Sequence, residues 1–126
     1  MRQIDSIHAL PERVVSTLEV IGIEARGHTL DPRSQSAVWR FGPNMVGHTV
    51  AFQVIFRSEG EDTRSRVDAT LEFPQKDGSH GVATSTAMIA VGRVNLSFVF
   101  QEFGDLHLVL SKDGETFFEE TIPIQP

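Results

Sequence analysis

The sequence has no cysteine, no tyrosine and a single tryptophan among its 126 residues. Without cysteine, neither a disulfide framework nor a thiolate zinc site can form. The first eight residues lack the apolar core of a signal peptide, and no later stretch approaches about 18 apolar residues in a row. We therefore expect one cytoplasmic domain over residues 1–126, of bacterial or phage origin and without a membrane span.

Positive charge is also scarce, since the formal net charge at pH 7 is −6. Nucleic acids and anionic membranes need clustered positive charge, so we expect neither as a partner. The acid is concentrated near the end of the chain, where the segment from Glu102 onward holds six acidic residues and only Lys112 as a base. Two interpretations remain open, which are a solvated acidic edge and a patch that binds a basic protein.

Apolar and polar residues alternate with period two, which indicates β-strands with one buried face. Glycine-rich or Asp-Gly turns separate these runs, as in all-β sandwiches and barrels. We expect the apolar residues of each run to line one core between two sheets. The predicted strands are Thr49–Phe56, Arg66–Phe73, Val94–Phe100 and Leu106–Leu110.

The segment Pro11–Ile21 allows two structures. Its apolar residues have helical spacing, Pro11 suits a first helical turn and Gly22 could end a helix. The β-branched content of Thr17–Ile23 and its alternation favour a strand. We favour the strand and keep the helix as the alternative.

The length of the hairpin loop around Asp113-Gly114 can be predicted from which residues of the second strand it turns toward the core. A two-residue loop would place Glu119 on the apolar face, whereas a three-residue loop that includes Lys112 keeps it in water. The second choice pairs Leu108 with Phe118 and turns Ile122 and Ile124 inward. We therefore predict a three-residue loop with Gly114 in the left-handed region.

Three stretches together resemble a known family. They are Ser16–Ile23, the Leu71-Glu72-Phe73 run leading to Asp77-Gly78, and Phe98–Leu106 followed by Lys112–Glu115. The sequence is similar in them to an uncharacterised bacterial family of single immunoglobulin-like domains. The resemblance implies an all-β, immunoglobulin-like antiparallel sandwich of about seven or eight strands, with a strand at Thr17–Ile23 and no assigned catalytic residue. Leu106 departs from the family, which has tyrosine there, so no tyrosine corner can form.

No motif for catalysis, metal or cofactor binding stands out. The five histidines are dispersed without metal-ligand spacing, and we expect no metal or cofactor. The run Asp77–Gly81 holds an acid, a hydroxyl and an imidazole, but adjacency in a turn does not give the geometry of a triad. We interpret these residues as a turn.

We therefore expect a non-enzymatic protein-binding or assembly module, with self-association through a sheet edge as one form of it. The alternatives are a ligand-binding sandwich with an apolar cavity and a small hydrolase whose site is assembled from loops. Trp39 fits a core position or an exposed anchor with Phe41. The candidate surfaces are the loop Gly42–His48, the turn Ser58–Thr63 and the C-terminal hairpin, and the candidate binding residues are Trp39, Phe41, Asn44, Glu115 and Glu119.

Overall fold

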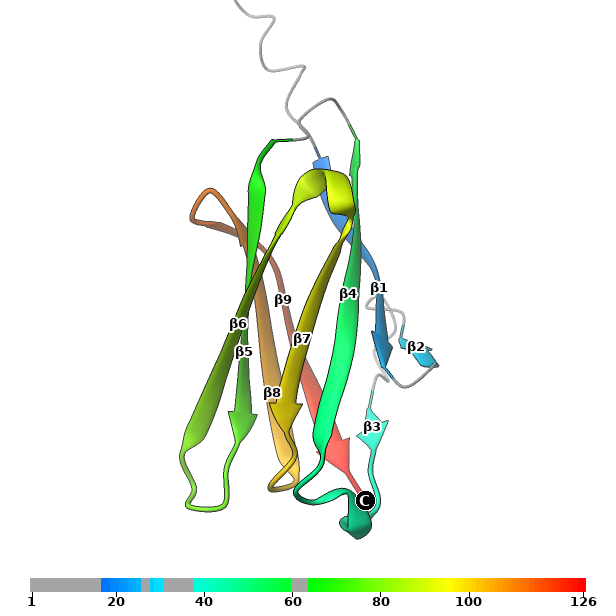
Figure 1. Cartoon of the computed structure of the whole chain (residues 1–126), viewed down its shortest axis with the longest axis vertical. Helices are drawn as coiled ribbons and strands as arrows, with labels where there is room; N and C mark the ends of the chain where they lie inside the picture. Colours follow the sequence, from blue (N-terminus) through cyan, green and yellow to red (C-terminus); the bar gives the residue numbers. More distant parts are fainter. Residues whose placement is uncertain (1–16, 26–27, 31–37, 60–63) are drawn as a thin grey trace, which may run out of the picture.

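The computed structural model describes residues 17–25, 28–30, 38–59 and 64–126, which form nine β-strands in two sheets (Figure 1). The all-β prediction is confirmed. Seven strands have seven residues or more, and β2 and β3 have three and two, too few for alternation to reveal. In these residues no helix is long and apolar enough to cross a membrane. The strands are β1 Thr17–Ala25, β2 His28–Leu30, β3 Trp39–Arg40, β4 Thr49–Glu59, β5 Arg66–Pro74, β6 His80–Met88, β7 Arg93–Val99, β8 Gly104–Lys112 and β9 Glu115–Gln125, with short 3₁₀ helices η2 Pro43–Met45 and η3 Ile89–Val91.

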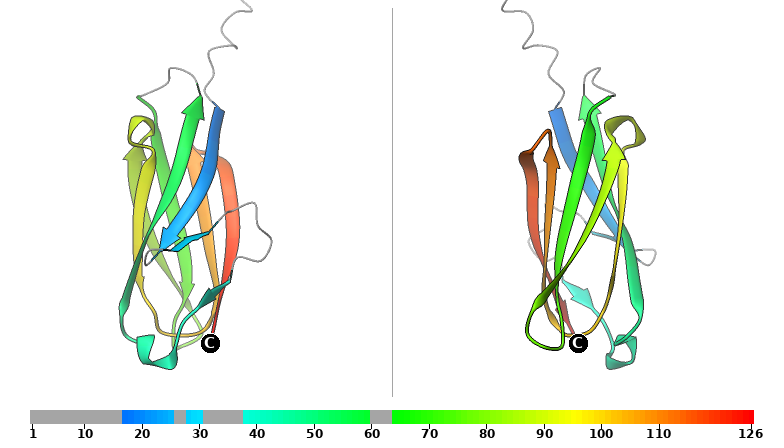
Figure 2. Two further views of the ribbon diagram at one scale, coloured as in Figure 1. Left: turned by 90° about the vertical axis from the view of Figure 1, so that its right-hand side faces the viewer. Right: turned by 60° about the vertical axis from the view of Figure 1, so that its left-hand side comes forward.

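The first sheet has the order β2-β1-β4-β7 and the second has the order β3-β9-β8-β5-β6. All paired strands are antiparallel except β3 and β9, which are parallel. The two sheets lie face to face (Figure 2). Because η3 links β6 to β7, the last strand of one sheet lies beside the last strand of the other along one side of the molecule (Figures 1 and 2).

The core is the apolar set that the alternation predicted. Val54, Leu71, Leu106, Leu108 and Leu110 are 0% exposed. Burial of such side chains contributes about 25 cal/mol for each Å² of apolar surface removed from water. The two inner faces therefore hold this domain together, and they leave the outer faces, edges and loops for contact with other molecules.

The first strand confirms the strand interpretation for Thr17–Ile21, while Pro11–Ser16 lies outside the described residues. A bulge shifts the register against β4 between Val20 and Gly22. As a result Val20 and Ile23 are both buried, although two residues lie between them and their positions differ in parity, and Ile21 is 42% exposed. A regular strand could not have turned both Val20 and Ile23 inward.

The β8–β9 hairpin has a shorter loop than predicted, but its apolar residues face the core as predicted. Lys112 pairs with Glu115, so the loop is the two residues Asp113 and Gly114, at φ 52° and 80°. Positive φ at both positions is the requirement of a type I′ turn, for which Asp-Gly is a favoured pair. The register then shifts between Leu110 and Ser111, which leaves Phe117 as an extra residue.

The bulge at Phe117 restores the parity that a two-residue loop alone would have lost. Leu110 pairs with Phe118 and Leu108 with Glu120, so the predicted pairing of Leu108 with Phe118 is wrong. Phe118 nevertheless packs on the core, and Ile122 and Ile124 are buried at 0% and 1% exposure, as predicted. A local irregularity thus satisfied both the turn preference and the burial of the apolar face.

Candidate partner-binding surfaces

Trp39 and Phe41 belong to the core, which confirms the core interpretation of Trp39. Each is 6% exposed. The Trp39 ring centroid lies 5.2 Å from that of Phe52, and the Phe41 centroid lies 5.2 Å from that of Phe100. The hypothesis that Trp39 and Phe41 form an exposed anchor is therefore wrong. The parallel pairing of Trp39 with Ile124 on β9 places this face of β3 over the core.

Asn44 is exposed in the short helix η2, at the end of the sandwich near the C-terminus (Figure 1). The loop is held by backbone hydrogen bonds, in which Gly47 N donates to Phe100 O at 2.7 Å and His48 N donates to Met45 O at 3.0 Å. A loop fixed in this way presents its side chains without a large cost in conformational entropy. Asn44 therefore stays a candidate for partner binding.

The acidic residues after Glu102 do not form one face. Glu102 precedes β8 and Asp113 follows it, so the nine residues of this strand, about 30 Å long, separate them. Glu119 is exposed on the outer face of β9, where its Oε2 lies 3.4 Å from Nε2 of His107. Glu120 is half-buried on the inward side opposite Leu108. The hypothesis of a single acidic surface is therefore wrong.

The tip of the β8–β9 hairpin has charges of both signs around it. Asp113 lines an open pocket of about 640 Å³ together with Arg64, Arg66 and Asp68, and Arg66 Nε lies 3.3 Å from Asp68 Oδ1. Glu115, beside this tip, is exposed. Glu115 and Glu119 each remain a candidate, on two separate surfaces. Of the predicted turn Ser58–Thr63, only the two residues that end β4 are described.

Of the run Asp77–Gly81, the residues Asp77 to Ser79 lie in a turn stabilised by its own side chains, whereas His80 and Gly81 begin β6, so the turn interpretation is wrong for those two. Asp77 Oδ1 accepts hydrogen bonds from the Ser79 hydroxyl at 2.6 Å and from the Ser79 backbone N–H at 3.0 Å. The same hydroxyl lies 2.8 Å from Gln75 Oε1. These bonds, the hydroxyl bond foremost, lower the pKa of Asp77 below its ordinary value of 3.8. The turn interpretation accounts for both polar side chains.

The histidine and carboxylate side chains of the described residues do not cluster into a metal site. No group of three or more His, Asp or Glu side chains there could hold a metal ion. His8 lies outside the described residues, while His48 lies in a loop and His80 begins β6, and both of these are exposed. These positions give no ligand set on which a metal site could be built.

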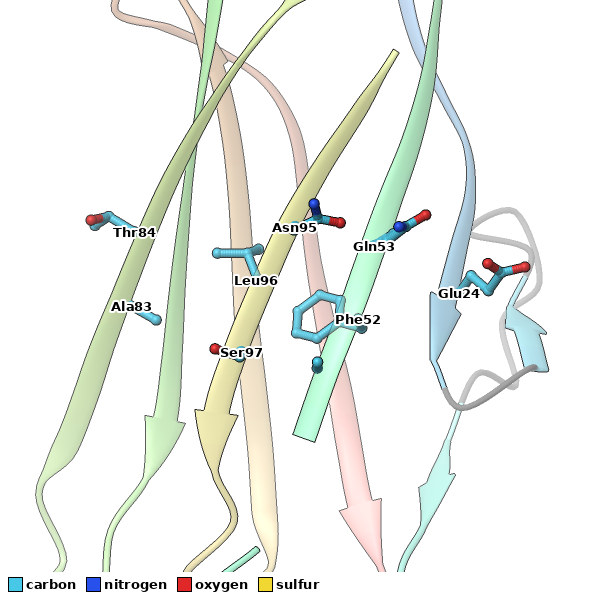
Figure 3. Close-up of a pocket in the computed structure, with 9 residues that line it drawn as sticks. Glu24, Phe52, Gln53, Ala83, Thr84, Asn95, Leu96 and Ser97 are labelled. Atoms are coloured by element: carbon cyan, nitrogen blue, oxygen red, sulfur yellow. The ribbon is translucent and has the colours of Figure 1, made fainter. Parts of the chain in front are cut away.

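An open groove of about 610 Å³ lies where the edge of the second sheet meets the first (Figure 3). Ala83 and Thr84 of β6 line one side of it. Leu96 of β7 and Phe52 of β4 extend on the side toward β6, whereas Asn95 points the other way (Figure 3). The lining of the groove therefore mixes apolar side chains, such as Phe52 and Leu96, with polar ones, such as Asn95 and Ser97.

Sequence reasoning missed this region because β6 gives a weak signal. The inward positions of β6 are the small residues Gly81, Ala83, Ser85 and Ala87, so the strand lacks the large alternating side chains that reveal the others. No protein-family model matches the chain, and a search of curated proteins finds no significant similarity. The surface chemistry of the described residues is therefore the basis for a functional proposal.

Proposed function

We propose that this chain is a non-enzymatic protein-binding or assembly module, built on an immunoglobulin-like sandwich and acting in the cytoplasm of a bacterial or phage-infected cell. The observation that carries the proposal is where large apolar side chains are exposed. Four of the six among the described residues belong to β6, η3 and β7, namely Val82, Met88, Val91 and Val99, at 59%, 41%, 63% and 41% exposure. These four residues lie at separate points along β6, η3 and β7, the side on which the two sheets end next to each other, so a partner that binds there would contact them as separate apolar anchors.

The order of the strands supports the immunoglobulin-like part of the proposal. The orders β1-β4-β7 and β9-β8-β5-β6 correspond to the A-B-E and G-F-C-C′ orders of immunoglobulin-like sandwiches. The chain also crosses between the sheets after β4, β6 and β7, as such domains do at the matching connections. Domains of this architecture commonly present loops or edges to partner proteins.

Among the alternatives, a ligand-binding sandwich would need an enclosed apolar cavity. The two pockets described here both open to solvent, and neither is lined mainly by core side chains. A serine hydrolase triad in this turn would need an imidazole beside the hydroxyl of Ser79, whereas that hydroxyl contacts the side chains of Asp77 and Gln75. No observation favours either alternative over a binding module.

Comparative affinity capture from the native host tests the proposal. The immobilised chain, a V82K/V91K variant and a matched I21K/V46K variant are compared by quantitative mass spectrometry. Ile21 and Val46 are the other two exposed large apolar residues, at 42% and 38% exposure. We expect a captured protein that V82K/V91K loses and I21K/V46K retains. Absence of any specifically captured protein, or equal loss in both variants, would contradict the proposed site.

Charge reversal tests the other candidate surfaces in the same assay. If a basic partner binds near the hairpin, E115K and E119K should weaken its capture and reduce its dependence on salt. The two variants are made separately, because the two side chains lie on different surfaces. Asn44→Ala tests the η2 loop. Unchanged capture by a variant would remove that surface from the proposal.

A further inference from the structure

Strand β6 ends the second sheet without the usual protection of an edge. Natural edge strands carry charges, prolines or bulges that prevent pairing with another chain. The nine residues His80–Met88 include no Asp, Glu, Lys, Arg or proline. Their register against β5 runs without a shift from Pro74↔His80 to Arg66↔Met88. The edge is therefore long, regular and uncharged.

Hydrogen bonds at both ends of the β5–β6 pair show which backbone N–H and C=O groups of β6 do not bond to β5. Gln75 N donates to Ser79 O and Ile89 N donates to Ser65 O, each at 3.0 Å, in the same register as the strands. Bonded and non-bonded pairs alternate along an antiparallel ladder. Odd-numbered residues of β6 therefore bond to β5, and even-numbered residues point N–H and C=O away from it. Within the described residues no strand pairs with that side of β6.

The side chains along this edge suit another strand. The even-numbered residues Val82, Thr84 and Thr86 are exposed on the outer face, and all three are β-branched. Such residues pack well across a strand pair. The odd-numbered residues on the inner side are small, so they leave room for a neighbouring backbone. Val82, at 59% exposure, would lose part of its contact with water to the neighbouring strand in such a pairing.

The same edge is complementary to itself. A two-fold axis through Thr84 would place His80 opposite Met88 and Val82 opposite Thr86 of the other copy, and Thr84 opposite Thr84. Every free even-numbered position would then join a hydrogen-bonded pair, and no like charges would face each other. Because each chain has a net charge of −6, an uncharged strand is a place where two copies can approach with little repulsion.

We propose that a second copy of this chain adds to the β6 edge in antiparallel orientation, with Thr84 on the two-fold axis. The two five-stranded sheets then form one continuous ten-stranded sheet across the dimer. This inference rests on the proposed function, because it identifies the assembly partner. A second copy satisfies all five free positions of the edge in one register.

Charge complementation at Thr84 tests the dimer and its register. The wild-type chain and the T84K and T84E variants are examined by sedimentation velocity over a range of concentrations, alone and as a T84K–T84E mixture. We expect the wild type to dimerise and each variant to bind itself about tenfold more weakly, since like charges meet on the axis. The mixture should restore dimers, because opposite charges then face each other.

Thr70 provides the matched control, because it pairs with Thr84 from β5 on the same outer face. T70K and T70E should dimerise like the wild type. Thr84→Pro gives an independent test, since it removes an N–H that points to the free edge and costs no bond to β5. Circular dichroism verifies that every variant is folded.

A wild-type chain that stays monomeric at millimolar concentration would overturn this inference, as would T84K and T84E variants that each dimerise fully. Capture of a different protein through Val82 and Val91, by a monomeric wild-type chain, would leave the proposed function in place. Failure of the dimer and failure of the binding function are thus distinguishable.

Discussion

Gly81 offers a test in which backbone preference and packing predict opposite results. It lies on the inward side of β6 opposite Phe73 and is absent from the glycines with positive φ. On backbone grounds alone, alanine in such a strand position should stabilise the fold by about 0.5–1 kcal/mol. An added Cβ would, however, lie 2.5 Å from Phe73 Cε2 and 2.7 Å from Gln75 Nε2, with Phe73 Cζ closer still.

The ring of Phe73 therefore has to move if Gly81 becomes alanine. That ring packs on Phe98 with centroids 5.5 Å apart, so displacing it disturbs the edge of the core. Overpacking of this kind costs about 1–3 kcal/mol. After the backbone gain is subtracted, we expect G81A to lower the free energy of unfolding by about 1 kcal/mol.

Urea unfolding at equilibrium measures this change, with an unchanged m-value as evidence that the denatured state is unaffected. F73L shortens the side chain that the new Cβ meets, so the cost of G81A should fall by at least about 0.5 kcal/mol in the F73L background. S85A, at a neighbouring inward position, serves as the control because it adds no atom. A G81A variant as stable as the wild type, or a cost that persists with F73L, would refute the steric explanation.

Two further predictions follow from turns. G114A should lower the free energy of unfolding by about 1 kcal/mol, measured by thermal unfolding. Gly114 has φ +80° and nothing lies within 4 Å of an added Cβ, so the penalty is conformational and not steric. An unchanged unfolding midpoint would contradict the type I′ turn. By NMR titration, the pKa of Asp77 should lie below 3.8, and S79A should move that pKa toward 3.8 by removing the largest cause. Because the pKa is lowered in the folded state, the stabilisation is present above about pH 3.8 and is lost as pH falls through the lowered pKa; an Asp77 pKa that S79A leaves unchanged would contradict this account.

Much of the fold could be predicted from residue alternation. Val54, Leu71 and Leu108 have to be buried somewhere, and in a strand all the residues of that parity go to the same side. The same alternation favours the strand at Thr17–Ile21, whereas the sequence leaves Trp39 open between the core and an exposed anchor, because β3 has only two residues. Alternation fails where the inward residues are small, and for this reason β6 and its free edge could not be recognised.

The details that bear on function depended on tertiary structure. Alternation in the sequence showed which face of β4, β5, β7 and β8 is buried, because alternation and the cost of exposing apolar surface are local properties of the chain. It did not determine the length of the hairpin loop, since the bulge at Phe117 satisfies the turn and the core together. Nor could it show the order of the strands in the two sheets, or that β6 ends a sheet beside β7. Those relations arise only when distant segments pair, because strand order is set by long-range packing and no short stretch of sequence encodes it.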